Sequence, residues 1–147
     1  MTSAAGKAEG EAAAAPARSG PELVVSEIFR SIQGESTFAG LPCVFVRLAG
    51  CHLRCSYCDT AYAFHGGRRV PVAEVMDRVA ALGGGLAEVT GGEPLLQRAA
   101  HPLMRGLADR GFTVLLETSG AVDIGPVDPR VRVIMDLKCP GSGVLEF

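Results

Sequence analysis

Short apolar runs alternate with amphipathic segments along most of the chain, and this pattern predicts alternating strands and helices. Extended stretches rich in branched and aliphatic residues are expected at 23–29, 44–48, 86–90, 112–116 and 131–137. Helices are expected at 71–82 and 102–110, where apolar residues recur at helical spacing. Pro71 can take the first position of the first helix, and Gly83 and Gly111 can end the two helices.

The order of these elements predicts an α/β fold. Strands that alternate with helices favour parallel βα units, and right-handed connections let the sheet curl toward a barrel or wind as an open sheet. In both architectures function belongs at the carboxyl ends of the strands. Glycine-rich or polar motifs follow Leu48, Val89, Leu116 and Met135, at the ends of four expected strands.

Composition narrows the protein class. The chain has 147 residues, which suggests one domain, and 48% of them are hydrophobic. Residues 1–20 are rich in Ala and Gly and are expected to be a disordered tail, so the domain is expected at 21–147. A net charge of −2 gives no sign of a basic surface that would bind nucleic acid or a membrane. No apolar run reaches the roughly 20 residues of a membrane helix. With no secretory signal visible, we expect a cytoplasmic, reducing location.

Three of the five cysteines form the strongest chemical signal. Cys51, Cys55 and Cys58 have the spacing C-x3-C-x2-C on a loop that follows an expected strand. Three thiolates can hold three irons of a [4Fe–4S] cluster and leave the fourth iron open. That open iron could bind the amino and carboxylate groups of S-adenosylmethionine.

Two other interpretations of these cysteines stay open at this point. A structural zinc site would need a fourth ligand, which His52 or Cys43 could supply, although neither has a usual spacing. Such a site would make the chain a non-catalytic metal-binding module. The cysteines could also be inert and buried.

The motif C-x3-C-x-aromatic-C, with Tyr57 as the aromatic residue, resembles the signature of the radical S-adenosylmethionine superfamily. The resemblance implies a partial (β/α) barrel of the TIM type. It also implies a [4Fe–4S] cluster on the three cysteines, with S-adenosylmethionine as cofactor. By position in the family, the cofactor contacts are Tyr57, Cys58, Asp59, Gly92, Asp136, Leu137 and Lys138.

Further motifs resemble the 7-carboxy-7-deazaguanine synthase family over about residues 22–143. They are 27–35 (EIFRSIQGE), 40–42 (GLP), 45–50 (FVRLAG) and 58–60 (CDT). That family uses Mg²⁺ and contracts the ring of 6-carboxy-5,6,7,8-tetrahydropterin to 7-carboxy-7-deazaguanine, a queuosine precursor, with loss of ammonia. The resemblance makes Thr60 the Mg²⁺ ligand. The pterin contacts it implies are Ile32, Gln33, Gly34, Arg47 and Thr90.

The residue types suit these roles, and some of them also have a simpler explanation. A Gln amide has donors and an acceptor for a pterin edge, and Arg can grip a carboxylate at two points. Arg47 could instead be a solvated strand residue, and Thr60 could cap a turn. Gly91 and Gly92 let backbone approach a ligand, or form a plain turn before a helix that begins at Pro94.

The resemblance also sets expectations for partners. It implies a small pterin substrate, an electron donor such as a flavodoxin or ferredoxin, and a homodimer at full length, without nucleic acid or membrane. Family members continue with further βα units, so we expect the later units to be missing after Phe147. A glycyl-radical-enzyme activating enzyme is the rival interpretation, and the stretch 31–35 and Arg47 argue against it. We assign no role to Glu35, Glu117, His65 or His101.

Overall fold

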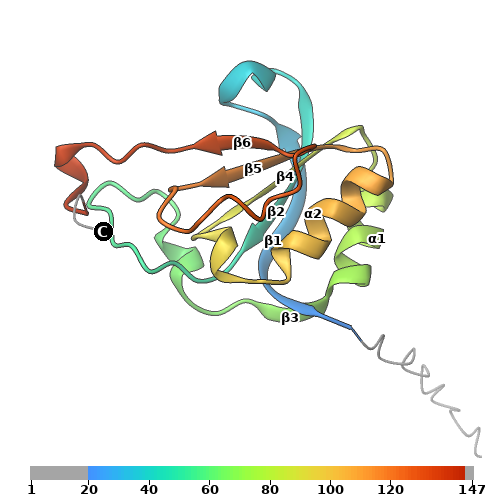
Figure 1. The fold of residues 1–147 in the computed structure, drawn as a ribbon, viewed down its shortest axis with the longest axis horizontal. Helices are drawn as coiled ribbons and strands as arrows, with labels where there is room; N and C mark the ends of the chain where they lie inside the picture. Colours follow the sequence, from blue (N-terminus) through green and yellow to red (C-terminus); the bar gives the residue numbers. More distant parts are fainter. Residues whose placement is uncertain (1–19, 145–147) are drawn as a thin grey trace, which may run out of the picture.

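Six strands form one mixed sheet in the computed structural model, which describes residues 20–144 (Figure 1). The strands run β1 (Glu22–Ile32), β2 (Pro42–Leu48), β3 (Arg68–Pro71), β4 (Leu86–Gly91), β5 (Thr113–Thr118) and β6 (Arg132–Met135). Their order across the sheet is β3-β1-β2-β4-β5-β6. The tail expected at residues 1–20 lies, except for Gly20, outside the described residues.

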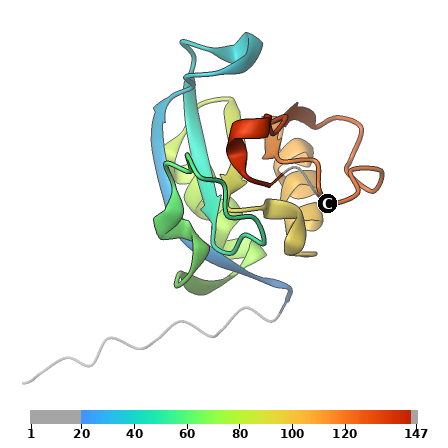
Figure 2. The ribbon, with the colours of Figure 1, turned by 90° about the vertical axis from the view of Figure 1, so that its left-hand side faces the viewer.

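The α/β expectation is confirmed for the parallel part of the sheet, formed by β2, β4, β5 and β6. The expectation of parallel units is wrong for β1, which runs antiparallel to both β2 and β3. The connection 33–41 is too short for a crossover helix, and such a connection joins antiparallel strands. It carries the 3-10 turn η1 (Ser36–Phe38), which projects from the sheet in Figures 1 and 2.

Both expected helices are present. Helix α1 (Val72–Leu82) ends at Gly83, where φ is +70°, as expected. Pro71 is not its first residue, because it closes β3 and stands at the N-cap. Helix α2 (Ala100–Asp109) begins two residues before the expected start. Pro102 is tolerated inside it because amide groups in the first turn have no intrahelical partner.

The two faces of the sheet have different environments. Alternate residues of β2, such as Val44, Val46 and Leu48, point to the face that packs on α1 and α2 and forms the main core. In the helices, Val75 and Leu107 are fully buried against this face. The apolar face of the sheet packs on the apolar faces of α1 and α2. This contact supplies most of the hydrophobic stabilisation, because that stabilisation scales with the apolar area removed from water.

The opposite face is lined by the intervening residues and becomes more polar toward the carboxyl ends of the strands. Near the amino ends, Cys43, Leu86 and Leu115 form a small second apolar cluster. The segment 119–131, between β5 and β6, contains no helix, unlike the connection between β4 and β5. No helix within residues 20–144 is long and apolar enough to cross a membrane.

Candidate active site

A cavity of about 310 Å³ lies on the polar face, at the carboxyl ends of the parallel strands. Most of the residues expected in the site line it: Gln33, Gly34, Arg47, Cys51, Cys55, Tyr57, Cys58, Asp59, Thr60, Thr90, Gly92, Asp136 and Lys138. Ile32 and Leu137 are not among the lining residues, and their exposed fractions are 64% and 75%. The tertiary structure therefore gathers residues from segments far apart in the sequence.

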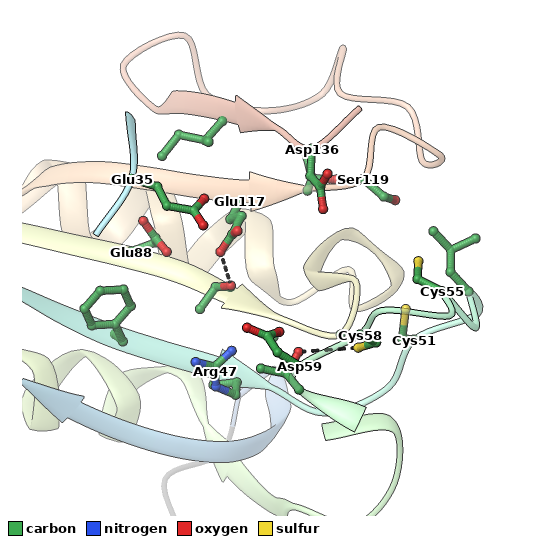
Figure 3. Close-up of a pocket in the computed structure, with 18 of the residues that line it drawn as sticks. Glu35, Arg47, Cys51, Cys55, Cys58, Asp59, Glu88, Glu117, Ser119 and Asp136 are labelled. Atoms are coloured by element: carbon green, nitrogen blue, oxygen red, sulfur yellow. Dashed lines mark hydrogen bonds between the residues drawn. The ribbon is translucent and has the colours of Figure 1, made fainter. Parts of the chain in front are cut away.

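The three expected cluster ligands lie on the loop that follows β2, at one end of this cavity (Figure 3). Cys51, Cys55 and Cys58 are partly exposed free thiols. Burial, followed by the charges of Glu93 and the other two cysteines, raises the pKa of the Cys51 thiol. Iron binding would therefore release a proton from it.

A mononuclear zinc site has no support from this geometry. Within residues 20–144, no group of three or more His, Cys, Asp or Glu side chains converges to hold one metal ion. Cys43, one suggested fourth ligand, is buried on the sheet and lines no part of the cavity. A cluster differs from zinc in this respect, because its thiolates bind separate irons.

The cysteine loop is held by contacts from two sides. Arg54 donates from Nη1 to the carbonyls of Cys51 at 2.7 Å and Leu53 at 2.6 Å, and its guanidinium lies 4.4 Å from the ring centre of Phe64. On the other side, the Ser56 amide donates to the Ser142 carbonyl at 2.9 Å. Ser142 belongs to the turn η4 (Pro140–Ser142), which lies beside the cysteine loop in Figure 1.

Gly91 and Gly92 bring the end of β4 against the cysteine loop. The Gly92 amide donates to the Leu48 carbonyl at 3.1 Å, and a Cβ atom on Gly92 would lie 2.1 Å from the Gly50 carbonyl oxygen. Gly91 has a φ of +136°, and a Cβ atom on it would lie 2.1 Å from the Leu48 carbonyl oxygen. These glycines are thus required for backbone packing beside Cys51, whatever ligand they also meet.

Glu93 ties the ends of β4 and β5 together and is only 1% exposed. It accepts hydrogen bonds from Thr118 Oγ1 at 2.8 Å, from Ser119 Oγ at 2.6 Å and from the Ser119 amide at 2.9 Å. It also accepts from the Leu95 amide at 3.2 Å, at the start of η3 (Pro94–Leu96). The hydroxyls of Thr118 and Ser119 are therefore already bonded to Glu93.

Arg47 is not a solvated strand residue, because only 15% of its side chain is exposed. Its Nε donates to Glu27 Oε1 at 2.8 Å, and Tyr62 Oη donates to the same oxygen at 2.8 Å. The guanidinium also lies 5.9 Å from the ring centres of Phe29 and Tyr62. The Nε donor of Arg47 is therefore used by Glu27, and the two terminal nitrogens of Arg47 remain for a ligand carboxylate.

A second polar group lies deeper in the cavity. Gln33 is 3% exposed, and its Nε2 donates to Glu88 of β4. Thr90 Oγ1 donates to Glu117 Oε2 at 2.6 Å. Glu88, Glu117 and Glu35 all line the cavity, so three carboxyl groups face the expected pterin contacts (Figure 3).

The remaining expected residues surround the cysteine loop. Thr60 precedes η2 (Ala61–Phe64) but makes no side-chain cap, and its Oγ1 lies 3.7 Å from Cys58 Sγ. The capping explanation for Thr60 is thus not supported. Lys138 bonds to Asp136 and lies 5.9 Å from the ring centre of Tyr57.

Sequence reasoning missed three polar residues near the site. Glu27 and Tyr62 orient Arg47, and Glu88 forms part of the cavity floor. The strict alternation Ala87-Glu88-Val89-Thr90 was the available signal, because it places Glu88 and Thr90 on one face. Of the two histidines without an assigned role, His65 lies edge-to-face with the Phe64 ring, and neither His65 nor His101 lines the cavity.

The chain is similar in sequence and in fold to known proteins. The profile of the Radical SAM superfamily matches residues 45–139, which include the cysteine loop and the ends of β4, β5 and β6. Among solved structures, the crystal structure of QueE from Escherichia coli superposes with a TM-score of 0.73 at 25% sequence identity. The superposition covers 84% of this chain and 63% of that one.

Curated relatives are named 7-carboxy-7-deazaguanine synthase. The relative from Chlorobaculum tepidum is 56% identical over 124 residues, covering 84% of this chain and 56% of its own length. The relative from Koribacter versatilis is 50% identical over 123 residues, covering 82% and 54%. The relative from Thermoplasma acidophilum is 42% identical over 124 residues, covering 83% and 59%. The chain thus spans about half the length of the curated relatives it matches.

Proposed function

Because this chain belongs to the radical SAM superfamily, we propose that it acts as a 7-carboxy-7-deazaguanine synthase. In this proposal the protein converts 6-carboxy-5,6,7,8-tetrahydropterin to 7-carboxy-7-deazaguanine with loss of ammonia, a step toward queuosine in tRNA. Identity of 42–56% to three relatives of that name supports it. The observation that carries it is one cavity lined by the three cysteines, Arg47 and Gln33.

Superfamily membership implies an iron–sulfur cluster and S-adenosylmethionine. The thiols of Cys51, Cys55 and Cys58 fit a [4Fe–4S] cluster, because they lie on one loop, line one cavity and are in no disulfide. When bound, the cluster and S-adenosylmethionine supply the radical that begins the reaction. The protein's own part is to hold the cofactor and the substrate together and to exclude water.

Cofactor contacts are proposed for the residues around the cysteine loop. Tyr57 offers a flat apolar face for adenine, and the backbone at Gly92 lies directly against Gly50 and Cys51. Asp136 and Lys138 approach from the end of β6, where both line the cavity. Cys58, Asp59 and Leu137 complete the proposed set, Leu137 through its backbone, since its side chain is exposed.

Pterin binding is proposed at the other end of the cavity. The free terminal nitrogens of Arg47 would grip the substrate carboxylate, and Gln33 and Thr90 would bond to the polar edge of the ring. Ile32 and Gly34 belong to the same stretch, Ile32 through its backbone. Mg²⁺ is proposed at Thr60, whose hydroxyl is a hard oxygen facing the cavity, with substrate and water completing its shell.

An anaerobic assay tests the proposal. The protein is reconstituted with iron and sulfide and given reductant, S-adenosylmethionine, Mg²⁺ and the carboxy-tetrahydropterin, with a flavodoxin or ferredoxin as an alternative electron source. Release of 7-carboxy-7-deazaguanine and ammonia supports the synthase. Cleavage of S-adenosylmethionine that pterin neither stimulates nor couples to product would contradict it, as would one bound zinc in place of about four irons.

A further inference from the structure

Glu88 is a buried carboxyl group on the cavity floor for which the proposed function has no use. It stands in the middle of β4 and is only 3% exposed. A charged carboxylate at such a depth is costly unless it is paired, and its partner here is an amide. Its presence among the apolar residues of β4 needs a physical explanation.

The contacts of Glu88 join three separate segments of the chain. Gln33 Nε2 donates to Glu88 Oε2, and Gln33 Oε1 accepts from the Glu35 amide at 3.1 Å. On its other side Glu88 faces Glu117 of β5, and both carboxyl groups line the cavity. Glu117 in turn accepts from Thr90 Oγ1 at 2.6 Å. Hydrogen bonds therefore join Gln33 to Glu88 and Thr90 to Glu117, and the two carboxyl groups lie next to each other between these bonds.

The charges around Glu88 are unfavourable for ionisation. Burial, then the charge of Glu117 and more weakly that of Glu35, raises the pKa of Glu88 to about 7. From β2 the neighbouring titratable group is the Cys43 thiol, whose pKa burial and Glu88 raise to about 12. A hydrogen bond between two carboxyl groups also requires a proton on one of them. These charges favour a single proton between Glu88 and Glu117 near neutral pH.

We propose that Glu88 is a positioning residue, which as a neutral carboxyl donates to Glu117, accepts from Gln33 and so fixes the Gln33 amide toward the substrate. The identity of that substrate as a pterin rests on the proposed function, whereas the shared proton does not. One Nε2 hydrogen and one Oε1 lone pair of Gln33 remain for a ligand, and their directions are set by Glu88 and the Glu35 amide.

Loss of the proton breaks this arrangement. Two adjacent carboxylates repel one another, and Glu117 then has no donor from Glu88. The pterin edge would meet a displaced Gln33 and an added negative charge. Pterin affinity should therefore decline as the pH rises through about 7, by roughly tenfold for each unit once Glu88 is ionised.

The variant Glu88→Gln keeps the shape of a protonated Glu88 side chain but has no proton to lose in this pH range. A Gln amide can accept from Gln33 and donate to Glu117, and it does not titrate in this range. The dissociation constant of the carboxy-tetrahydropterin is measured anaerobically by calorimetry on the reconstituted protein, from about pH 6 to about pH 9. Wild type should weaken across the range, whereas Glu88→Gln should hold one affinity. Equal pH dependence in the two proteins would overturn the inference.

Two further variants distinguish a role of Glu88 in pterin binding from a general effect of removing a carboxylate. Glu88→Leu keeps the bulk but removes both hydrogen bonds, and we expect pterin binding to weaken about tenfold at every pH. Uncoupled cleavage of S-adenosylmethionine should persist in it, since Glu88 has no contact with the cysteine loop. Glu74→Gln on α1 is the matched control, because Glu74 pairs with Arg78 on the exposed face, and it should titrate as wild type does.

An infrared measurement tests the shared proton without any substrate. Wild type at about pH 6 should show the C=O stretch of a buried protonated carboxyl, which fades by about pH 9 and is absent from Glu88→Gln. Absence of that band in wild type overturns the inference whatever the protein binds. A normal band in a protein that does not bind pterin would leave the carboxyl pair standing and count against the proposed function instead.

Discussion

Glu27 holds Arg47 across the β1–β2 pair, where the two residues are direct register partners and Arg47 Nε donates to Glu27 Oε1 at 2.8 Å. Tyr62 donates to the same carboxylate oxygen from the loop after the cysteines. An arginine that must grip a carboxylate at two points gains from a fixed guanidinium plane, because less rotamer freedom is lost on binding. The β1 strand, although antiparallel, thus contributes to the site.

We predict that Glu27→Gln lowers pterin affinity by about tenfold or less, since one charge-assisted hydrogen bond is worth roughly 1.5 kcal/mol. Tyr62→Phe should have a smaller effect in the same direction. Calorimetric titration with the carboxy-tetrahydropterin measures both. Glu22→Gln, at an exposed position of the same strand, is the control and should bind as wild type does. A larger loss in Glu22→Gln than in Glu27→Gln would contradict the positioning role.

Arg47→Lys should weaken pterin binding without stopping uncoupled cleavage of S-adenosylmethionine. A Lys ammonium is a point charge and cannot make the two-point contact, which is worth roughly 1.5–3 kcal/mol. Product formation and 5′-deoxyadenosine release are measured together, so that binding and cleavage are separated. Wild-type pterin affinity in Arg47→Lys would remove the carboxylate clamp.

Each of Cys51→Ala, Cys55→Ala and Cys58→Ala should abolish the visible absorption of the iron–sulfur cluster, because each removes one thiolate ligand. Cys43→Ala and Cys139→Ala are the controls, and neither residue lines the cavity. Iron and sulfide analysis after anaerobic reconstitution gives the count. The ligand assignment fails if Cys139→Ala loses the cluster while Cys58→Ala keeps it.

Gly92→Ala should destabilise the cysteine loop and reduce cluster content. The new Cβ would lie 2.1 Å from the Gly50 carbonyl oxygen and 2.7 Å from Cys51 Cβ, so backbone must move. We expect a loss of roughly 1–3 kcal/mol in the free energy of unfolding. Gly85→Ala, with no atom within 4 Å of its Cβ, is the control. Full cluster loading in Gly92→Ala would show that the close approach is not needed.

The free energy of unfolding should fall as the pH rises from about 5 to about 8. Unfolded Glu88 loses its proton near 4.5 and folded Glu88 near 7, so ionisation favours the unfolded chain. This contribution is fully present below pH 4.5 and is lost as the pH rises through about 7, on the order of 1–3 kcal/mol. Urea unfolding of wild type and Glu88→Gln measures it. Identical pH profiles would contradict the raised pKa.

Local patterns in the sequence were enough to predict most elements and to place the three cysteines on one loop. Helices α1 and α2 and the parallel strands follow from apolar periodicity, which acts over a few residues. The three cysteines lie on one loop, so their shared location follows from their spacing. β3 escaped prediction because Arg68 and Arg69 give it no apolar run, and its pairing with β1 provides the missing stabilisation.

Only the tertiary structure decided how the site is assembled. Glu93, Thr118 and Ser119 meet because β4 and β5 are parallel neighbours whose carboxyl ends coincide. Gln33 reaches Glu88 because β1 turns back on β2, a reversal that hydrophobic periodicity does not encode. Periodicity fixes which face a side chain takes, but burial and the charge of Glu117 arise between distant segments. The sequence thus determined the cysteine loop, and strand pairing decided that Glu88 lies beside Gln33 and Glu117 in the cavity.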